Sequence, residues 1–179
     1  MRSHYRYRWR KALAKWKDVK IDIVPAGEFD PVMYQQYEAV YERSRYKLEK
    51  LKHDFFRHLP ESAKIMKGSI NDQLLGYAVI MENQDELVFL FTGFDYRLNH
   101  KYDTYLNLLL EIASYGLKNN FRVIDFGQAT EGTKQKLGCI LKKKKMYLYH
   151  SNPVIDTLAN MFISVLEYKP PQDRFTVFK

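Results

Sequence analysis

The sequence predicts an α+β domain, with helices on both faces of a mixed, mostly antiparallel sheet. First, 179 residues of which 46% are apolar suffice for one domain with a sizeable core. Second, three strand-like segments follow one another with only short turn-like links between them, as in an antiparallel meander. Third, the last of these segments leads into a long helix and a further strand. Such a crossover makes the strands on either side of the helix parallel.

The chain is predicted to begin with a basic helix and a strand. Residues 3–20 place apolar side chains at helical spacing, with cations on the other side of the helix. The apolar positions are Trp9, Leu13 and Trp16. Such a helix docks on the rest of the domain or on a further domain, or binds RNA or a membrane surface. Residues 20–27 alternate apolar and polar side chains and end in Pro-Ala-Gly, which indicates a strand.

Two helices are predicted before the meander. The first begins after Asp30, a suitable N-cap, with Pro31 at the first helical position. Its apolar stripe consists of Met33, Tyr37, Val40 and Tyr41. A second, shorter helix covers residues 53–59 and stops at Pro60.

The meander and the crossover are the clearest part of the pattern. The three predicted strands are 63–70, 74–82 and 86–94. The long helix covers 102–120, with Asp103 or Thr104 as its cap. The strand that follows, 121–127, has few surface positions, which indicates a central place in the sheet.

The remaining elements are shorter. A short helix, a strand at 146–150 and a helix from Pro153 to about Glu167 are predicted, and then an irregular tail. We therefore divide the chain into a basic N-terminal helix (1–19), a main domain (20–169) and a C-terminal tail (170–179).

Charge and cysteine content narrow the class of protein. The formal net charge of +8 favours anionic partners such as nucleic acid, phosphorylated cofactors or an anionic membrane face. A single cysteine, Cys139, excludes an internal disulfide and suits a cytoplasmic location. The sequence has no uninterrupted apolar run of about 18 residues, so neither a membrane span nor a signal peptide is expected.

The segment "GFDYRLNHKYDTYLNLLLEIASYGLKNNFRVIDFGQATEGTKQKLG" (93–138) resembles a branch of the GNAT acyltransferase fold. That branch is the BioF-like acetyltransferase domain, related to the Fem-type aminoacyl transferases. The matching positions are Gly93, Asp95, Asp125, Phe126, Gly127, Glu131, Lys134 and Gly138. The resemblance implies a GNAT-like sheet with a splayed parallel strand pair. It also implies an N-acyltransferase that moves an acyl group from acetyl-CoA or another acyl-CoA to an amine.

One loop departs from the family pattern. Typical GNAT domains wrap the CoA pyrophosphate in a Q/R-x-x-G-x-G/A loop, whereas residues 97–105, "RLNHKYDTY", contain no glycine. Pyrophosphate would instead bind the first backbone amides of the long helix. A capping Asp103 carboxylate would repel it. The residues expected to bind the donor are Thr92, Gly93, Phe94, Arg97, Lys101, Tyr102, Asp103 and Thr104, with His100 as a further source of charge.

Acyl transfer to an amine needs a base, a polarised carbonyl and an acid for the leaving thiolate. A backbone N–H near Gly93 is expected to hold the carbonyl, and this glycine lets the acyl chain approach the backbone. Asp125, at the end of its strand, binds or deprotonates the amine, or else caps the turn at Gly127 or pairs with Lys134. The other catalytic candidates are Glu131 as a base, Lys134 as an anion binder and Tyr147 as an acid.

Two alternative functions follow from the basic arm and the missing glycine loop. One is a Fem-like transferase that takes an aminoacyl group from charged tRNA, and the other is a non-catalytic GNAT-like binding module. The partners considered are a small-molecule amine, tRNA, a membrane contacted through the N-terminal helix, and a second copy or a missing second domain. No metal is predicted, because His53 and His58 are five residues apart on a helix and no cysteine lies near them.

Overall fold

The structure is a computed structural model that describes residues 1–44, 47, 49–128, 130–142, 149–162 and 175–178. The chain forms two compact units, which are described separately. The larger unit is Arg6–Gly127, and the smaller one combines Met1–Tyr5 with Gln128–Lys179.

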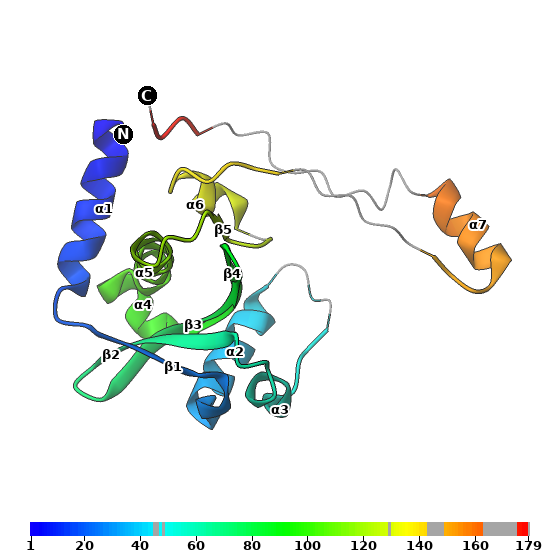
Figure 1. The fold of residues 1–179 in the computed structure, drawn as a ribbon, viewed down its shortest axis with the longest axis horizontal. Helices are drawn as coiled ribbons and strands as arrows, with labels where there is room; N and C mark the ends of the chain where they lie inside the picture. Colours follow the sequence, from blue (N-terminus) through cyan, green and yellow to red (C-terminus); the bar gives the residue numbers. More distant parts are fainter. Residues whose placement is uncertain (45–46, 48, 129, 143–148, 163–174, 179) are drawn as a thin grey trace. The chain divides into compact units, whose positions relative to one another are not determined.

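The larger unit contains a five-stranded sheet in the order β1-β2-β3-β4-β5 (Figure 1). Its strands are β1 (Lys20–Pro25), β2 (Ala63–Ile70), β3 (Gln73–Asn83), β4 (Glu86–Phe94) and β5 (Val123–Asp125). The first four pair antiparallel in sequence order, and β5 pairs parallel with β4. The predicted α+β fold with a mixed, mostly antiparallel sheet is therefore confirmed.

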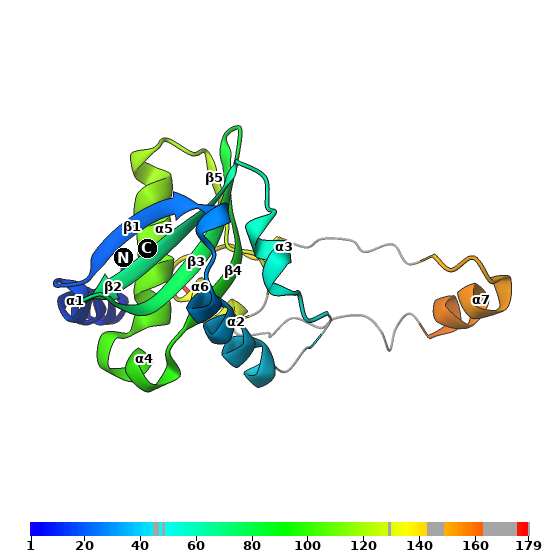
Figure 2. The ribbon, with the colours of Figure 1, turned by 90° about the horizontal axis from the view of Figure 1, so that it is seen from below.

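Helices cover both faces of this sheet, as predicted (Figure 2). One face carries α2 (Pro31–Arg43) and α3 (His53–Arg57), and the other carries α1 (Ser3–Trp16), α4 (Tyr96–Tyr102) and α5 (Thr104–Lys118). A single 3₁₀ turn, η1 (Ala26–Glu28), links β1 to α2. In the described part of the chain, no helix combines the length and the apolar character that crossing a bilayer requires.

The core under α2 and α3 is rich in aromatic side chains. The predicted cap is confirmed: the Asp30 carboxylate accepts a hydrogen bond from the backbone N–H of Met33 at 2.8 Å. Tyr77 is fully buried on β3, and its hydroxyl donates to the carbonyl oxygen of Met33 at 3.0 Å. Burial raises the pKa of Tyr77 well above its usual range, so this hydroxyl remains a donor. The cluster consists of Phe29, Met33, Tyr37, Phe56, Ile65, Tyr77 and Val79.

The opposite face is covered by α1 and α5. Trp16 packs there with Leu75 and Leu108. The predicted apolar stripe of α1 is wrong at Leu13, which is 46% exposed, because Ala12 and Trp16 are the residues that α1 buries. These two are four residues apart and therefore share one face of the helix, whereas Leu13 is turned away from it.

The predicted helix 102–120 is present as α5, but a further short helix, α4, precedes it where a loop was expected. Residues 96–102 form α4, and α5 begins at Thr104. Asp103 between them has φ of 47°, in the left-handed region, and this ends α4. Aspartate is one of the few non-glycine residues that adopt this conformation readily, so the break carries no glycine signal in the sequence.

The smaller unit is described only in part. It contains α6 (Glu131–Gln135) and α7 (Pro153–Met161), and the backbone N–H of Arg2 donates to the carbonyl oxygen of Val177 at 2.9 Å. Most of the predicted strand 146–150, the end of the predicted helix after residue 162 and most of the tail lie outside the described residues.

Candidate active site

The parallel strands β4 and β5 diverge soon after they start. Their register pairs Glu86 with Val123, Leu87 with Ile124 and Val88 with Asp125, and there it ends. From Phe89 onward β4 continues to Phe94 beyond the last parallel pair. We call this point the β4–β5 divergence.

A bulge in β4 lies directly after the last parallel pair. Opposite Val79 and Ile80 of β3, the partners on β4 are Phe91 and Phe89, so Leu90 is an extra residue. A β-bulge bends its strand and increases the local twist. The bulge therefore provides a physical cause for the divergence, because it turns the second half of β4 away from the direction of β5.

Beyond the bulge, every second backbone amide of β4 points away from β3, towards the side on which β5 pairs with the first half of β4. The N–H of Asp95 donates to the carbonyl oxygen of Leu75 on β3 at 2.9 Å. The carbonyl oxygen of Gly93 also points to β3, since it lies 2.9 Å from the position that a Cβ on Gly76 would take. In an antiparallel ladder, neighbouring residues point their N–H groups to opposite sides. The amides of Thr92 and Phe94 therefore point away from β3, on the side of the β4–β5 divergence.

Gly93 lies where α2 crosses β4. A Cβ on this residue would be 2.6 Å from Cε1 of Tyr77, 2.8 Å from the backbone nitrogen of Tyr37 and 2.9 Å from the carbonyl carbon of Gln36. The close approach of the helix backbone thus accounts for the glycine. The predicted role of Gly93 in admitting an acyl chain stays a prediction.

Asp125 ends β5 and shapes the turn that follows. Its Oδ1 accepts a hydrogen bond from the backbone N–H of Gly127 at 2.7 Å. Gly127 has φ of +67°, and a Cβ there would be 3.1 Å from the carbonyl oxygen of Phe89 in the bulge. The turn-capping role considered for Asp125 is therefore present, and its role as a base stays a prediction.

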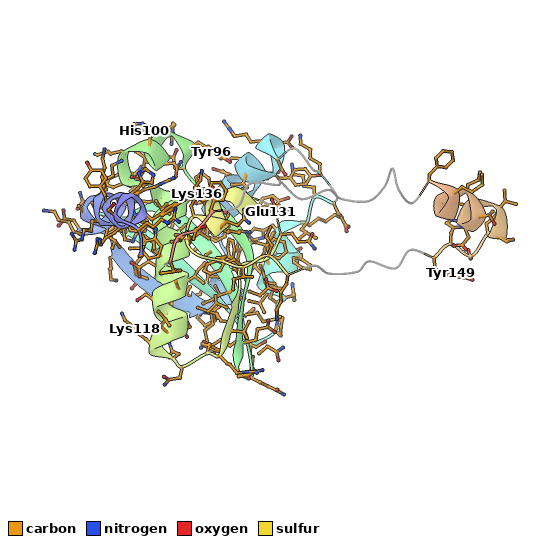
Figure 3. The ribbon with its side chains drawn as sticks, turned by 90° about the horizontal axis from the view of Figure 1, so that it is seen from above. Tyr96, His100, Lys118, Glu131, Lys136 and Tyr149 are labelled. Atoms are coloured by element: carbon orange, nitrogen blue, oxygen red, sulfur yellow. The ribbon has the colours of Figure 1, made fainter. Side chains whose placement is uncertain are left out.

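The joint between α4 and α5 takes the place of the glycine-rich loop. Lys15 of α1 forms an ion pair with Asp103 (Nζ–Oδ2 2.8 Å) and donates to the carbonyl oxygen of His100 at 3.0 Å. Asn107 donates through Nδ2 to the carbonyl oxygens of Tyr102 at 2.8 Å and Ala12 at 2.9 Å. Side chains from two neighbouring helices thus bind the last carbonyls of α4. Figure 3 shows His100 at the α4 end of α5 and Lys118 at the other end.

Asp103 is at the predicted N-cap position of α5, but it does not cap the helix through its side chain. Its side chain makes no capping hydrogen bond to α5, and its carboxylate faces Lys15 instead. The backbone N–H of Tyr105 is satisfied by Oδ1 of Asn99 at 3.1 Å. The neighbouring Thr104 is fully buried, and its hydroxyl has no hydrogen-bond partner among the described atoms.

The start of α4 holds Arg97, another residue predicted to bind the donor. Asp95 is the N-cap of this helix and binds Arg97. Its Oδ1 accepts from the backbone N–H of Arg97 at 2.9 Å and from the Arg97 Nε at 3.0 Å, and its Oδ2 accepts from the Arg97 Nη2 at 2.7 Å. The Arg97 guanidinium lowers the pKa of Asp95, aided by the backbone bond. Lys101 places its ammonium 4.9 Å from the ring centroid of Tyr102, which packs with the core around Trp16.

Replacing Asp95 by alanine is expected to cost about 1 kcal/mol of unfolding free energy at pH 7 through loss of the cap. A lowered folded-state pKa means that the charge contribution is fully present above the ordinary aspartate pKa of about 3.9, and is lost as the pH falls through the lower folded value. Urea unfolding at pH 7 and pH 3 checks this, with Asp95→Asn as the control because its amide oxygen keeps the cap. A difference between wild type and Asp95→Ala that is as large at pH 3 as at pH 7 would contradict the charge contribution.

The remaining catalytic candidates belong to the smaller unit. Glu131 is the first residue of α6, and Lys134, on the same helix, is buried and donates through Nζ to the carbonyl oxygen of Gln128 at 2.7 Å. Tyr147 lies outside the described residues. Burial raises the pKa of the Cys139 thiol, which disfavours the thiolate that a nucleophile needs. The described residues contain no group of three or more His, Cys, Asp or Glu side chains placed to hold a metal ion.

Sequence reasoning missed the residues that shape this site. Leu90 forms the bulge, and Lys15, Asn99 and Asn107 hold the α4–α5 joint. Asn107 carried a usable signal, because it is a polar residue next to Leu108 on the buried side of an apolar helix. The others carried none, since their roles depend on contacts between segments far apart in the sequence.

A bulged strand diverging from its parallel neighbour, with backbone amides facing the divergence, defines an acyltransferase of the GNAT fold class. Residues 1–135 match the acetyltransferase (GNAT) domain family. A comparison with curated proteins found no match.

Solved structures show the same fold at low sequence identity. One is an aminoglycoside acetyltransferase from an uncultured soil metagenomic sample, in complex with sisomicin: 11% identity, 76% of this chain and 97% of that chain covered, TM-score 0.51. Another is a ribosomal-protein-alanine N-acetyltransferase from Brucella melitensis biovar Abortus 2308: 12% identity, coverage 74% and 99%, TM-score 0.51. A third is glucosamine-6-phosphate N-acetyltransferase from Arabidopsis thaliana: 10% identity, coverage 73% and 97%, TM-score 0.51.

The chain belongs to the GNAT acetyltransferase domain family, in its BioF-like branch. It is an N-acetyltransferase, which moves an acetyl group from acetyl-CoA to an amine. The predicted fold, family and enzyme class are confirmed. The family favours this activity over a tRNA-dependent transferase and over a non-catalytic binding module.

Proposed function

We propose that the chain acetylates a small-molecule amine, with the acetyl thioester held at the β4–β5 divergence. The observation that carries this proposal is the end of the parallel register at Val88 and Asp125, followed by the bulge at Leu90. The amides of Thr92 and Phe94 therefore lie beyond the last residue of β4 that pairs with β5, and they point to the side of β4 on which β5 lay.

The reaction needs few groups from the protein. The amine nitrogen attacks the carbonyl carbon, a C–N bond forms, the C–S bond breaks, and the thiolate of CoA leaves. The Thr92 or Phe94 amide donates to the carbonyl oxygen as negative charge develops on it. Asp125, at the end of β5, takes the proton of the attacking amine, and the thiolate is protonated as it leaves. Glu131, Lys134 and Tyr147 stay predictions for the base, the anion binder and the acid.

The pyrophosphate of the donor is assigned to the start of α5. This helix follows β4 across the short helix α4, and its first amides carry the positive end of the helix dipole. The amide of Leu106 is the candidate, since Thr104 is fully buried and the amide of Tyr105 already bonds to Asn99. Lys101 on α4 adds positive charge nearby.

Aromatic side chains on α2 and β4 support an amine as the acceptor. The rings of Tyr37 and Tyr41 on α2 are 6.2 Å apart, and Tyr37 also contacts Phe91 of β4 edge-on at 6.4 Å. The Lys47 ammonium pairs with Glu42 at 2.9 Å and lies 5.8 Å from the ring centroid of Tyr41, so a carboxylate and an aromatic ring of α2 together hold an alkylammonium group. Acetylation of amino sugars and aminoglycosides, named for two of the similar structures, is in keeping with such an acceptor.

The basic helix favours an anionic second partner. Ala12 and Trp16 are buried against the domain, so the exposed surface of α1 is mainly cationic rather than apolar. Its exposed charges include Arg6, Arg8, Arg10 and Lys11. This favours a phosphate-rich partner such as tRNA over insertion into a membrane, which needs the apolar face.

Acetyl-CoA at about 100 times its Kd is expected to stabilise the native chain by about 2.7 kcal/mol. For a protein of this size that raises Tm by roughly 5–10 °C. The measurement is a thermal shift with acetyl-CoA, CoA and a charged tRNA side by side, followed by thiol release from acetyl-CoA with a panel of amino sugars and polyamines. The matched control for each amine is the analogue with hydroxyl in place of the amine. Thiol release that is equal with amine and hydroxyl analogues would contradict the proposal.

A further inference from the structure

A lysine of the N-terminal helix binds the α4–α5 joint. Lys15 lies in α1, outside the sheet and its crossover, yet its ammonium is 2.8 Å from the carboxylate of Asp103 and 3.0 Å from the carbonyl oxygen of His100. Both partners are half-buried, with exposed fractions of 30% for the Lys15 side chain and 35% for that of Asp103. Lys15 and Asp103 are 88 positions apart in the sequence.

The joint has two features that oppose the binding of a phosphate. Asp103 carries a negative charge directly before the first amides of α5, where it would repel an anion. It also holds the left-handed conformation at φ 47°, which aspartate adopts more readily than most residues but less freely than glycine. A glycine-rich loop has neither feature, because glycine has no carboxylate and adopts positive φ freely.

We propose that Lys15 is a positioning residue for the acetyl-CoA donor: it neutralises Asp103 and fixes the left-handed joint, so that the start of α5 accepts the donor's pyrophosphate without a glycine-rich loop. This rests on the proposed function, which assigns the pyrophosphate to that helix start. Lys15 acts through Asp103 and His100.

The neighbouring contacts support this role. Asn107, on the first turns of α5, bonds to the carbonyl oxygens of Ala12 in α1 and Tyr102 in α4. Asn99 of α4 bonds to the amide of Tyr105. Polar contacts thus connect the three helices at the joint, and among the contacts described above Lys15 contributes the positive charge.

The first test is Lys15→Met, which keeps most of the side-chain length and removes the charge. We expect KM for acetyl-CoA to rise about tenfold, with kcat within about twofold, because one uncompensated charge then faces the donor's phosphates. Lys17→Met is the control, since Lys17 directly follows the last residue of α1, is 74% exposed, and its Asp18 partner is 3.9 Å away. Lys15→Arg should keep KM close to the wild-type value.

The second test is rescue by glycine. In Lys15→Met/Asp103→Gly, the repelling carboxylate is gone and glycine adopts the left-handed joint unaided, so most of the lost donor affinity should return. Asp103→Ala, which removes the charge but disfavours positive φ, should lower Tm more than Asp103→Gly does. A simple loss of packing at Lys15 would not be rescued by glycine at position 103.

The Kd of acetyl-CoA and of 3′,5′-ADP, measured for each variant, reports donor binding without any acetyl transfer. An unchanged KM in Lys15→Met, or a double variant as weak as Lys15→Met, would overturn the role of Lys15 and leave the donor site standing. A wild-type chain that binds neither compound would refute the donor site itself, and the role of Lys15 with it.

Discussion

Replacing Thr92 by proline is expected to lower kcat for acetyl transfer about 10²- to 10³-fold, the effect of losing one donor to a developing oxyanion. Proline removes the backbone N–H, and it also removes the Thr92 hydroxyl and fixes the φ angle of this residue. The N–H of Thr92 points away from β3, as the bond from Asp95 to Leu75 and the position of the Gly93 carbonyl indicate. The β3–β4 ladder therefore loses no hydrogen bond at this position, which is where a strand tolerates proline.

The control for this variant is Thr92→Val, which changes the side chain and keeps the amide. The Thr92 hydroxyl donates to the carbonyl oxygen of Tyr77 at 2.7 Å, and both variants lose that bond. Comparing kcat and Tm of the two variants therefore separates the amide from the hydroxyl. Equal kcat values in Thr92→Pro and Thr92→Val, with melting transitions retained, would show that this amide does not stabilise the transition state.

Gly93→Ala is expected to destabilise the fold by about 3 kcal/mol, at the upper end of the usual cost of overpacking. The added methyl would be 2.8 Å from the backbone nitrogen of Tyr37 and 2.9 Å from the carbonyl carbon of Gln36. These are helix backbone atoms, so no rotamer change relieves the overlap, and α2 must move away from β4. Aromatic contacts between Tyr37 and Phe91 should loosen with it, which lowers activity as well.

Gly27→Ala is the matched control for this prediction. A Cβ on Gly27 would meet no atom within 4 Å. The same chemical change there should be neutral or stabilise the fold by about 0.4–1 kcal/mol, since it reduces the freedom of the unfolded chain. Urea unfolding of both variants provides the measurement. A Gly93→Ala protein as stable as Gly27→Ala would refute the close packing of α2 on β4.

Local patterns predicted most of the secondary structure because their causes are local. Alternating side chains gave the three strands of the meander, and the Asp30-Pro31 pair gave the start of α2. The same reasoning missed α4 and the joint at Asp103, where a left-handed aspartate pairs with Lys15 from another helix. No window of sequence around residue 103 contains that lysine.

The candidate site was predicted in outline. The order of strands and the long helix placed it at the end of β4, and family resemblance identified the thioester donor and the amine acceptor. Which amides face the donor depends on the direction of each N–H in the β3–β4 ladder, and the bulge at Leu90 decides where β4 leaves β5. Glycine at 93 looked like an opening for an acyl chain, whereas the packing of α2 accounts for it.

The sequence by itself determined most helices and strands, the crossover that makes β4 and β5 parallel, and the family. Periodicity, caps and motif residues each depend on residues that are close together in the sequence. Only the tertiary structure decided the bulge, the burial of Ala12 rather than Leu13, and the pairing of Lys15 with Asp103. These depend on which distant segments meet in space. A hydrogen-bond register or an ion pair between such segments is set by packing of the whole domain.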